Sequence, residues 1–316
     1  MKRGEFNYLT TNNQYKNSKK EWKVEIEDSR LIWLNNNLII NKNEYEKECL
    51  KQLKKINNAN FQKNFIYFIA SRERVRFDLK KPNKYSAENK NLILHLKFGS
   101  QKKIIKIELK EKIMIDFKLS EREIIFYYED GIKYYNIHDL LIEFRINLGF
   151  NTEINYVGIT SNPEDRPIGK KHRGLTDVLI NINDEEEKKD IFIIYNLFKV
   201  FCDTRKSNSQ IVYLIPNSLT SEIDLKKEGG ILENSLIMYF SCRVQELNKE
   251  REQSRLLNLL RKDMKEKKID RIAFYFENND ISEYFNFIDE RKEICKYFEI
   301  YEQNQEIIIN KNSKCL

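Results

Sequence analysis

Apolar and polar residues alternate with a period of two along much of the first half of the chain, which predicts β-strands. The segment from Trp22 to Ile40 is expected to form two short strands around a polar turn at Asp28 and Ser29. The run FIYFIA at 65–70 is fully apolar and predicts a buried strand. Alternation then resumes from Asn91 to Ile137 and predicts four or five antiparallel strands. Turn residues interrupt it at Gly99–Ser100, Ser120–Glu121 and Asp130–Gly131.

The second half of the chain mixes strand and helix patterns. Runs of β-branched and aromatic residues predict strands at 154–160, 191–202, 211–215 and 271–276, and a last apolar segment lies at 306–310. Apolar residues that recur every three or four positions predict helices at 42–56, 138–148, 231–240, 248–267 and 284–287, with a short helix or turn at 175–182. Gly229 and Gly230 are expected to break the chain before the helix at 231–240.

These elements predict an α+β protein. A chain of 316 residues has room for two ordinary domains. We expect an N-terminal mixed domain rich in antiparallel strands at 1–128, with a role in target binding. A small α/β domain at 129–316 is expected to follow, with the boundary near the end of the meander at 120–135.

Composition adds limits on partners and compartment. The net charge of +7, from 56 basic and 49 acidic residues, permits a phosphate-bearing partner without requiring one. No run approaches the ~18 uncharged apolar residues that span a bilayer, and the first residues lack the apolar core of a signal peptide. We therefore expect a soluble, cytoplasmic protein with no membrane partner. The five cysteines are scattered without a CxxC pair, which argues against a zinc site and a disulfide framework.

Lysines occupy the polar faces of the expected meander, at Lys97, Lys103, Lys106, Lys110 and Lys112. A sheet face lined by lysine can lie along a nucleic-acid backbone. Solubility and protection of strand edges are the favoured explanation, because no aromatic stacking platform accompanies these lysines.

The most concentrated candidate chemistry lies in YVGITSNPEDRPIGKKHR, from Tyr156 to Arg173. The strand at 154–160 ends in a Ser-Asn-Pro turn, and Arg166 and His172 follow it. A rigid strand that delivers polar side chains to a loop is a common way to build a site. A buried strand followed by a solvated basic turn explains the same residues about as well.

In this stretch and downstream, the sequence resembles the GIY-YIG nuclease family. Tyr156-Val157-Gly158 is similar to the family's second signature tripeptide, and Arg166 lies eight residues after the glycine, at the spacing of the family's catalytic arginine. His172 stands near the place where many members carry a histidine. Glu233-Asn234-Ser235-Leu236-Ile237 fits the helix that carries the family's metal-binding glutamate, and Asn248 follows it. No GIY tripeptide occurs, and the nearest stretch is Gly131-Ile132-Lys133-Tyr134-Tyr135.

The resemblance implies a divalent-metal-dependent endonuclease that hydrolyses DNA, with RNA left open as a substrate and a homodimer left open as the assembly. Glu233 would hold Mg²⁺ or Mn²⁺, whose remaining ligands are water and substrate phosphate. Arg166 would bind a phosphate oxygen, Tyr156 would orient or deprotonate water, and His172 would serve as base or proton relay. Basic and amide side chains would contact the nucleic acid: Lys170, Lys171, Arg173 and Asn248.

Each of these residues also has an ordinary structural explanation. Tyr156 can be a packing residue, His172 a solvated loop histidine, and Glu233 a first-turn carboxylate that complements the helix dipole. Two other functions therefore stay open: a nucleic-acid-binding module with a decayed site, and a protein-interaction scaffold. If the nuclease interpretation holds, a restriction-type, mobile-element or defence enzyme would fit it.

Overall fold

The computed structural model describes most of the chain. The described residues are 2–34, 51, 55, 64–109, 114–163, 175–178, 180, 189–205, 211–242, 245, 249–276, 284, 286–289, 293–294 and 296–311. The protein is a mixed α+β structure, rich in strands, with several sheets, which confirms the expected fold class at this level. Among the described helices, none is long and apolar enough to cross a membrane.

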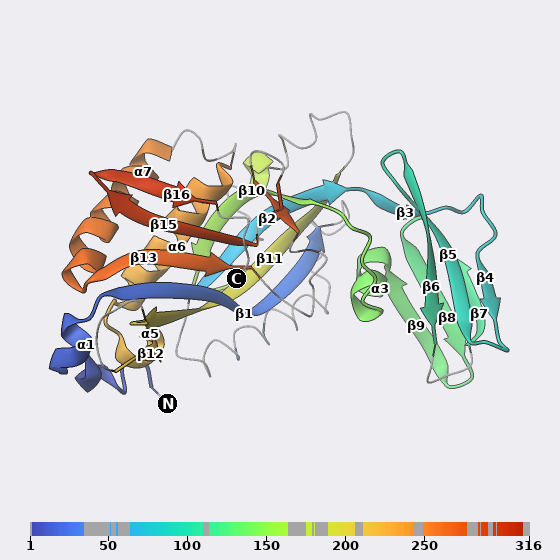
Figure 1. Ribbon diagram of the computed structural model, residues 1–316. Coiled ribbons are helices and arrows are strands. Elements are labelled where there is room, and N and C mark those ends of the chain that lie inside the picture. The colour runs from blue at the N-terminus through green and yellow to red at the C-terminus, as the bar shows by residue number, and fades with distance from the viewer. Residues whose placement is uncertain are drawn as a thin grey trace.

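The largest unit is a mixed sheet to which nine strands of the described chain contribute, called here the main sheet (Figure 1). Across it, the strands follow the order β14 (Phe287–Ile288), β10 (Thr152–Thr160), β2 (Phe65–Glu73), β11 (Lys189–Asp203), β1 (Lys20–Leu34), β13 (Ile269–Tyr275), β15 (Tyr297–Gln303) and β16 (Glu306–Asn310). The short strand β12 (Leu214–Pro216) pairs with the end of β11. The pairs β1–β13 and β10–β14 are parallel, and the other pairs are antiparallel.

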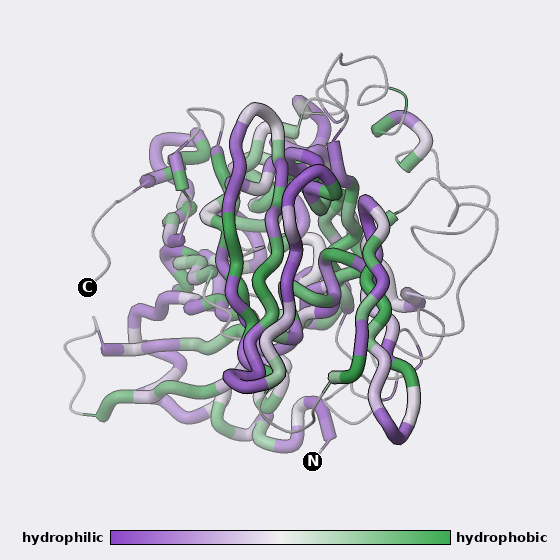
Figure 2. Tube along the Cα trace, turned by 90° about the vertical axis from the view of Figure 1, so that its right-hand side faces the viewer, coloured by the Kyte–Doolittle hydropathy of each residue, from purple (hydrophilic) through white to green (hydrophobic). Residues whose placement is uncertain are grey.

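Between β2 and β10 the chain builds a separate unit, residues 75–150, called here the β-module. It contains two small sheets, and their inward-facing residues form a hydrophobic core of their own. One sheet has β3 (Val75–Phe77), β4 (Lys84–Ser86), β5 (Asn91–Phe98) and β6 (Gln101–Glu108). The other has β7 (Met114–Leu119), β8 (Glu123–Tyr128) and β9 (Gly131–Asn136), followed by helix α3 (Ile137–Glu143). Hydrophilic and hydrophobic residues alternate along these hairpins (Figure 2).

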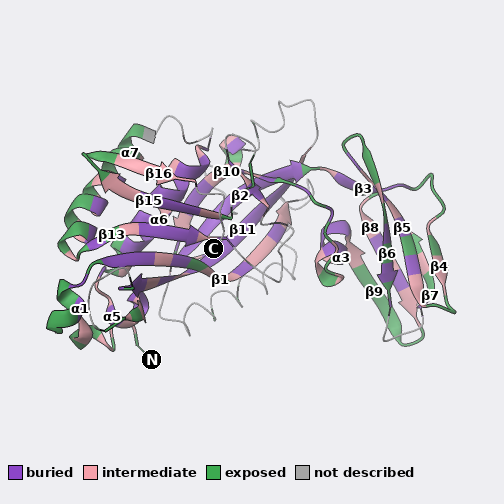
Figure 3. Ribbon diagram, in the orientation of Figure 1, coloured by how far each residue is buried: buried purple, intermediate pink, exposed green. Residues whose placement is uncertain are grey.

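Buried residues concentrate in the central strands of the main sheet (Figure 3). Strand β2 is buried at every position from Phe65 to Arg72, because both of its faces are covered. One face packs against helix α6 (Leu225–Phe240), which contributes Ile231, Leu236 and Ile237 to the larger core. The other face carries Tyr67 and Ile69, which belong to a smaller core with Val178. The candidate site residues Tyr156 and Glu233 are divided between these two faces.

The remaining helices lie around the main sheet. They are the 3-10 helix η1 (Asn7–Thr11), α1 (Asn13–Asn17), α5 (Asn217–Thr220), α7 (Lys249–Asn258) and the π-helical turn η3 (Leu259–Met264).

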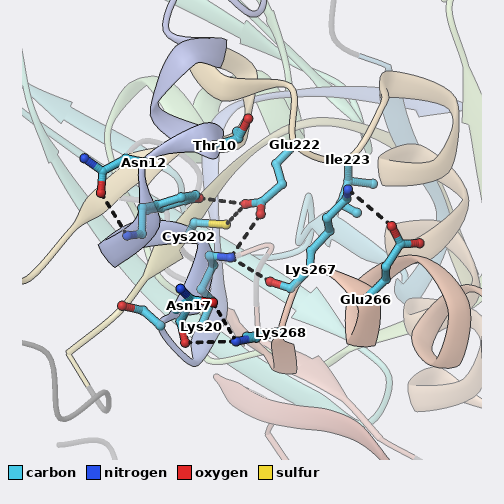
Figure 4. Close-up of polar contacts among 12 residues, drawn as sticks. Thr10, Asn12, Asn17, Lys20, Cys202, Glu222, Ile223, Glu266, Lys267 and Lys268 are labelled. Carbon is cyan, nitrogen blue, oxygen red and sulfur yellow. Dashed lines mark hydrogen bonds and ion pairs between the residues drawn. The ribbon is translucent and has the colours of Figure 1, made fainter.

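A buried polar cluster fixes the N-terminal segment to the main sheet (Figure 4). Tyr15 Oη donates a hydrogen bond to Glu222 at 2.7 Å, and Lys20 Nζ lies 3.0 Å from the other oxygen of the same carboxylate. The Cys202 thiol is 3.6 Å from Glu222. Burial raises the pKa of Cys202 to about 12, so this thiol stays protonated and unreactive at neutral pH. The cluster is therefore a structural contact.

A second buried cluster, called here the junction, joins the β-module to the main sheet at Asp190 of β11. Arg122 Nη2 donates to Asp190 Oδ1 at 2.5 Å, and His138 Nε2 lies 3.0 Å from Oδ2. The backbone N–H of Val75, where the chain enters the β-module, also donates to this carboxylate at 3.1 Å. The other ring nitrogen of His138 is 3.0 Å from Tyr284 Oη. His138 thus has a structural role.

Several sequence predictions are confirmed. The meander strands, β2, β10, β11, β13 and β16 occur within a few residues of the predicted positions. The helix at 248–267 occurs as α7 followed by η3. Residues 175–178 are helical, while most of the helix predicted at 42–56 lies outside the described residues.

Other predictions are wrong in detail. Instead of two strands around Asp28 and Ser29, β1 is one strand with a bulge between Ile26 and Asp28, because β11 pairs with it along its whole length. Helix α3 ends at Glu143, before Gly149. The helix predicted at 284–287 does not include Phe287, which begins the two-residue strand β14. Helix α6 begins at Leu225, so Gly229 and Gly230 lie inside it and do not break it.

At the expected domain boundary, near residue 128, the chain has a different arrangement from the one predicted. Residue 128 is the last residue of β8, which pairs with β9 across a tight turn inside the β-module. The main sheet takes β1 and β2 from one side of this position and its other strands from the opposite side. Local alternation identifies strands, but it carries no information about which distant strands pair.

Candidate functional site

Tyr156 lies on β10, and its ring stacks on a second tyrosine from the neighbouring strand. Antiparallel pairing of β10 with β2 places Gly158 opposite Tyr67. The rings of Tyr67 and Tyr156 are nearly parallel, with centroids 6.0 Å apart and an interplanar angle of 19°. The Tyr67 ring crosses directly over Gly158, so a Cβ atom at this position would collide with the end of the ring. Glycine is required here because the tyrosine occupies the space of a side chain.

Tyr195 of β11 completes this aromatic group, which is called here the tyrosine cluster. Its ring centroid lies 6.2 Å from that of Tyr67. Its hydroxyl donates a hydrogen bond to the carbonyl oxygen of Pro163 at 3.0 Å, which holds the chain after β10 against the sheet. Tyr67 and Tyr195 are fully buried, while Tyr156 is half-buried. Tyr156 is thus the member of the cluster that reaches the surface.

The outer edge of β10 is closed by a side chain. The Gln245 amide accepts a hydrogen bond from the Val157 N–H at 2.9 Å and donates one to the Val157 carbonyl at 2.8 Å. It therefore satisfies both backbone groups of Val157 in the way a neighbouring strand would. This contact fixes the backbone of the Tyr-Val-Gly tripeptide from the side opposite β2.

Helix α6 carries Glu233 and is fixed at its first turns. The Asp224 side chain caps the helix by accepting from the Lys227 N–H at 3.0 Å. Glu228 is buried and bonded to Arg3 Nη2 at 2.7 Å, so the N-terminal segment holds the helix start. A Cβ atom on Gly229 would lie 2.5 Å from Ile159 Cδ1 and 2.8 Å from Asn64 Nδ2. The glycine therefore lets α6 approach β10 and the start of β2 closely.

Glu233 is half-buried and lines a cavity of about 620 Å³ at the end of β10, called here the Glu233 cavity. The strand end contributes the polar residues Thr160, Ser161 and Asn162 to its wall. Two cations face the same cavity, Lys226 of α6 and Arg255 of α7. The other lining residues are Asn64, Ile159, Leu225 and Gly230. The cavity combines one carboxylate, two cations and several hydroxyl and amide groups.

The position of Glu233 removes one of its alternative explanations. Because α6 begins at Leu225, Glu233 stands more than two turns into the helix. A carboxylate stabilises the helix dipole only within about the first turn. The interpretation of Glu233 as a helix-dipole residue is therefore wrong.

Tyr156 does not line the Glu233 cavity. Along β10, Val157 packs with α6 in the larger core and Ile159 lies against it, whereas Tyr156 packs with Tyr67 in the core on the other face. Tyr156 and Val157 are adjacent in the sequence, but their side chains point to opposite faces of the sheet. Both faces end at the turn that follows β10, where the Thr160 hydroxyl accepts a hydrogen bond from the Asn162 N–H at 3.0 Å.

The other predicted site residues lie outside the described residues. These are Arg166, His172, Lys170, Lys171, Arg173 and Asn248. The stretch Gly131–Tyr135, the nearest sequence match to a first signature tripeptide, lies on β9 in the β-module. Tyr134 and Tyr135 are thus in a different sheet from Tyr156.

Sequence reasoning missed Tyr67, Asn64, Lys226, Gln245 and Arg255. Tyr67 had a usable signal, since it is the polar-tipped residue in the otherwise apolar run FIYFIA. The others lacked one, because nothing local indicates that Gln245 reaches β10 or that Arg255 reaches α6.

The donor chemistry of the Glu233 cavity fits a hard cation. Mg²⁺ and Mn²⁺ prefer carboxylate, hydroxyl and carbonyl oxygen, and one protein carboxylate suffices when water and phosphate supply the rest. Within the described ranges, no group of three or more His, Cys, Asp or Glu side chains could hold a metal ion. A cation here would therefore have Glu233 as its carboxylate ligand, with water and phosphate supplying ligands from outside the protein.

The chain was compared with known proteins. It matches no protein-family model, no curated protein and no solved structure.

Proposed function

We propose that this protein is a divalent-metal-dependent endonuclease that hydrolyses phosphodiester bonds in DNA, with a site of the GIY-YIG type. The observation that carries the proposal is the pairing of β2 with β10. It sets Tyr67 over Gly158 and against Tyr156, and α6 then brings Glu233 to the end of the same strand. The resemblance in the sequence concerned the second signature strand and the glutamate helix.

The same pairing supplies a candidate for the missing first signature strand. Strand β2 is the direct antiparallel neighbour of the Tyr-Val-Gly tripeptide, so its residues lie beside that tripeptide. Its Phe65-Ile66-Tyr67 would take the place of the GIY tripeptide, with tyrosine at the third position. The whole β-module would then be an insertion between the two signature strands. This accounts for the long interval that separates them in the sequence.

Each residue would have a defined task in hydrolysis. Glu233, with Thr160 and Asn162 nearby, would hold the Mg²⁺ or Mn²⁺ ion, which when bound supplies charge compensation for the phosphate. Arg255 would bind a non-bridging phosphate oxygen, for which a guanidinium is well matched, and Arg166 would do so from the loop after β10. Tyr67 would hold the Tyr156 ring in place, so that the Tyr156 hydroxyl can orient the attacking water.

One observation favours a second candidate function, a nucleic-acid-binding module without cleavage. The ring of Tyr156 and the carboxylate of Glu233 belong to opposite faces of the sheet around β10. A phosphate bound by both would have to sit at the strand end, where the two faces meet. RNA remains an alternative substrate, since phosphate contacts do not distinguish it from DNA.

The test is Glu233→Gln, assayed by plasmid cleavage with Mg²⁺ or Mn²⁺. The change keeps the side-chain volume and the helix but removes the charge that holds a cation, so we expect cleavage to fall by at least about 10²-fold. Glu88→Gln, at an exposed turn of the β-module, is the matched control and should cut at the wild-type rate. A folded Glu233→Gln variant with full activity would remove this residue from the site. A wild type inert on DNA and RNA with either metal would favour the binding module.

A further inference from the structure

A row of cations lies along α7 and η3, and one of them, Arg255, also lines the Glu233 cavity. Arg251, Arg255 and Lys262 occupy positions i, i+4 and i+11, which a helix places on one side. All three are exposed, whereas Leu256, Leu260 and Met264 on the other side of the same segment are buried. We call Arg251, Arg255 and Lys262, together with Lys226 of α6, the cationic groove.

The groove is hollow as well as charged. A cavity of about 480 Å³ is lined by Arg251, Arg255, Asn258, Leu259, Lys262 and Asp263. Arg255 lines both this cavity and the Glu233 cavity, so the two are neighbours that share one wall residue. A ligand that lies along α7 could therefore extend into the Glu233 cavity past Arg255.

The cations of the groove are not used for internal ion pairing. Among the described residues, Lys226, Arg251 and Lys262 form no ion pair, and Arg255 has only a 3.8 Å contact with Glu252. The acidic residue in the groove wall, Asp263, forms an ion pair with Lys227 at 2.7 Å. Elsewhere in the protein, partly buried cations such as Lys23 and Lys311 have carboxylate partners within 3 Å. The groove thus presents uncompensated positive charge.

The helix geometry at the groove is unusual. Residues Leu259–Met264 form a π-helical turn, in which the Lys265 N–H bonds to the Leu260 carbonyl. Such wide turns are rare and frequently mark functional positions. Here the turn carries Lys262 and directly follows Asn258 and the Arg251–Arg255 pair. Like charges four residues apart disfavour the helix, so this pair gives no local stability.

We propose that the cationic groove binds the phosphate chain of a nucleic acid and leads it into the Glu233 cavity. This inference rests on the proposed function and adds the path of the substrate. Charge complementarity identifies the ligand, since arginine forks match phosphate oxygens and release the counterions condensed on a nucleic acid. Eleven residues of helix span about 16 Å, enough to follow several phosphates of one strand.

The test compares two charge-matched triple variants of the full chain in binding assays. Arg251→Gln, Arg255→Gln and Lys262→Gln remove three groove cations. Lys84→Gln, Lys102→Gln and Lys106→Gln remove three exposed cations of the β-module. Binding of a fluorescent DNA duplex, and of an RNA of equal length, is measured over a series of NaCl concentrations without divalent metal. The groove variant should lower the slope of log K against log salt by about 3, and the control should leave it unchanged.

Further variants keep the test decisive. If the triple variant fails to fold, Arg255→Gln alone should lower the slope by about 1, while Arg255→Lys should restore most of it. An unchanged slope in the groove variant, or a loss confined to the β-module control, would overturn the inference. The inference would also be overturned if polyglutamate displaced the fluorescent DNA from the protein as effectively as unlabelled DNA of equal charge does.

The catalytic proposal can fail separately. Glu233→Gln should bind DNA with the wild-type slope or slightly more tightly, because it removes a negative charge from the path. If this variant cleaves normally while the groove variant loses binding, the groove is supported and the proposed site is wrong. If the groove variant binds normally while Glu233→Gln is inactive, the site stands and the groove is wrong.

Discussion

The main sheet and the β-module are both built from paired strands, but they assemble over very different distances in the chain. In the β-module, β5 pairs with β6, β7 with β8 and β8 with β9, each across a short turn. In the main sheet, β1 pairs with β11 and with β13, and β2 pairs with β10 across the whole β-module. Local pairs form with little loss of chain entropy, whereas these pairs of the main sheet require long loops to close.

This difference also separates the candidate chemistry from the scaffold. The Glu233 cavity is lined by residues from β10, from the start of β2 and from two helices, which only the long-range pairs bring together. The β-module is complete in itself, with its own core and hairpins. A change in the β-module should therefore leave the cavity intact, unless it acts through the junction.

The largest effect is expected at the junction, where the two regions meet. Asp190→Asn keeps the shape of the side chain but removes the charge of a buried carboxylate and leaves the half-buried Arg122 without its charged partner. Removal of one partner of a buried ion pair costs about 3–5 kcal/mol in the free energy of unfolding. Urea unfolding should show this loss. Asp270→Asn, exposed on β13, is the control and should change stability by less than about 0.5 kcal/mol.

The junction also predicts a pH dependence. Burial lowers the pKa of His138. Burial alone would raise the pKa of Asp190, but His138 and Arg122 outweigh it and hold the pKa below its ordinary value. Both groups bind fewer protons in the folded protein than in the unfolded chain, so stability falls as pH falls. The loss begins below about pH 6.5 through His138 and continues below about pH 4 through Asp190. If Asp190→Asn unfolds like its control, or loses as much stability below pH 4 as the wild type does, the junction does not link the regions as described.

The comparison explains how much of the structure the sequence predicts. The meander is predicted well because β5 pairs with β6, and β8 with β7 and β9, each directly beside it in the chain and alternating in register with it. The single long strand β1 is missed because its pairing with β11 overrides the local turn signal of Asp28 and Ser29. The length of α6 is missed because Gly229, a helix breaker by propensity, is required for the close approach to Ile159.

Some residues of the candidate site can likewise be predicted from local sequence, and others cannot. Tyr156 and Glu233 are identifiable because short motifs surround them. Tyr67 is not, since only the register of β2 against β10 reveals that it faces Gly158. Lys226 and Arg255 reach the cavity through the packing of α7 on α6, which leaves no local pattern in either helix.

An intermediate effect is expected from Gly158→Ala in the main sheet. The new methyl group would overlap the end of the Tyr67 ring, which is fully buried and cannot move without disturbing Tyr195. Overpacking of this kind costs about 1–3 kcal/mol. Urea unfolding should therefore show a lower midpoint. The same substitution in a Tyr67→Ala background should cost less than in the wild type, since the nearer collision partner is gone and only the 2.8 Å approach to Tyr156 Cε1 remains. Equal costs in the two backgrounds would show that Tyr67 does not set the requirement for glycine.

The smallest effect, and the sharpest comparison, comes from the adjacent glycines of α6. A Cβ atom on Gly230 would meet its nearest neighbour, Arg255 Nη2, at an ordinary 3.5 Å, so Gly230→Ala should raise the free energy of unfolding by about 0.4–1 kcal/mol. At Gly229 the same helix gain of about 1 kcal/mol is outweighed by the overlap with Ile159, so Gly229→Ala should lower it by about 1 kcal/mol. Both variants should be measured by urea unfolding with unchanged m values. Two variants that shift stability in the same direction would contradict the close packing of α6 on β10. Opposite signs at neighbouring positions would show that this long-range contact, and not helix propensity, determines where the helix that carries Glu233 lies.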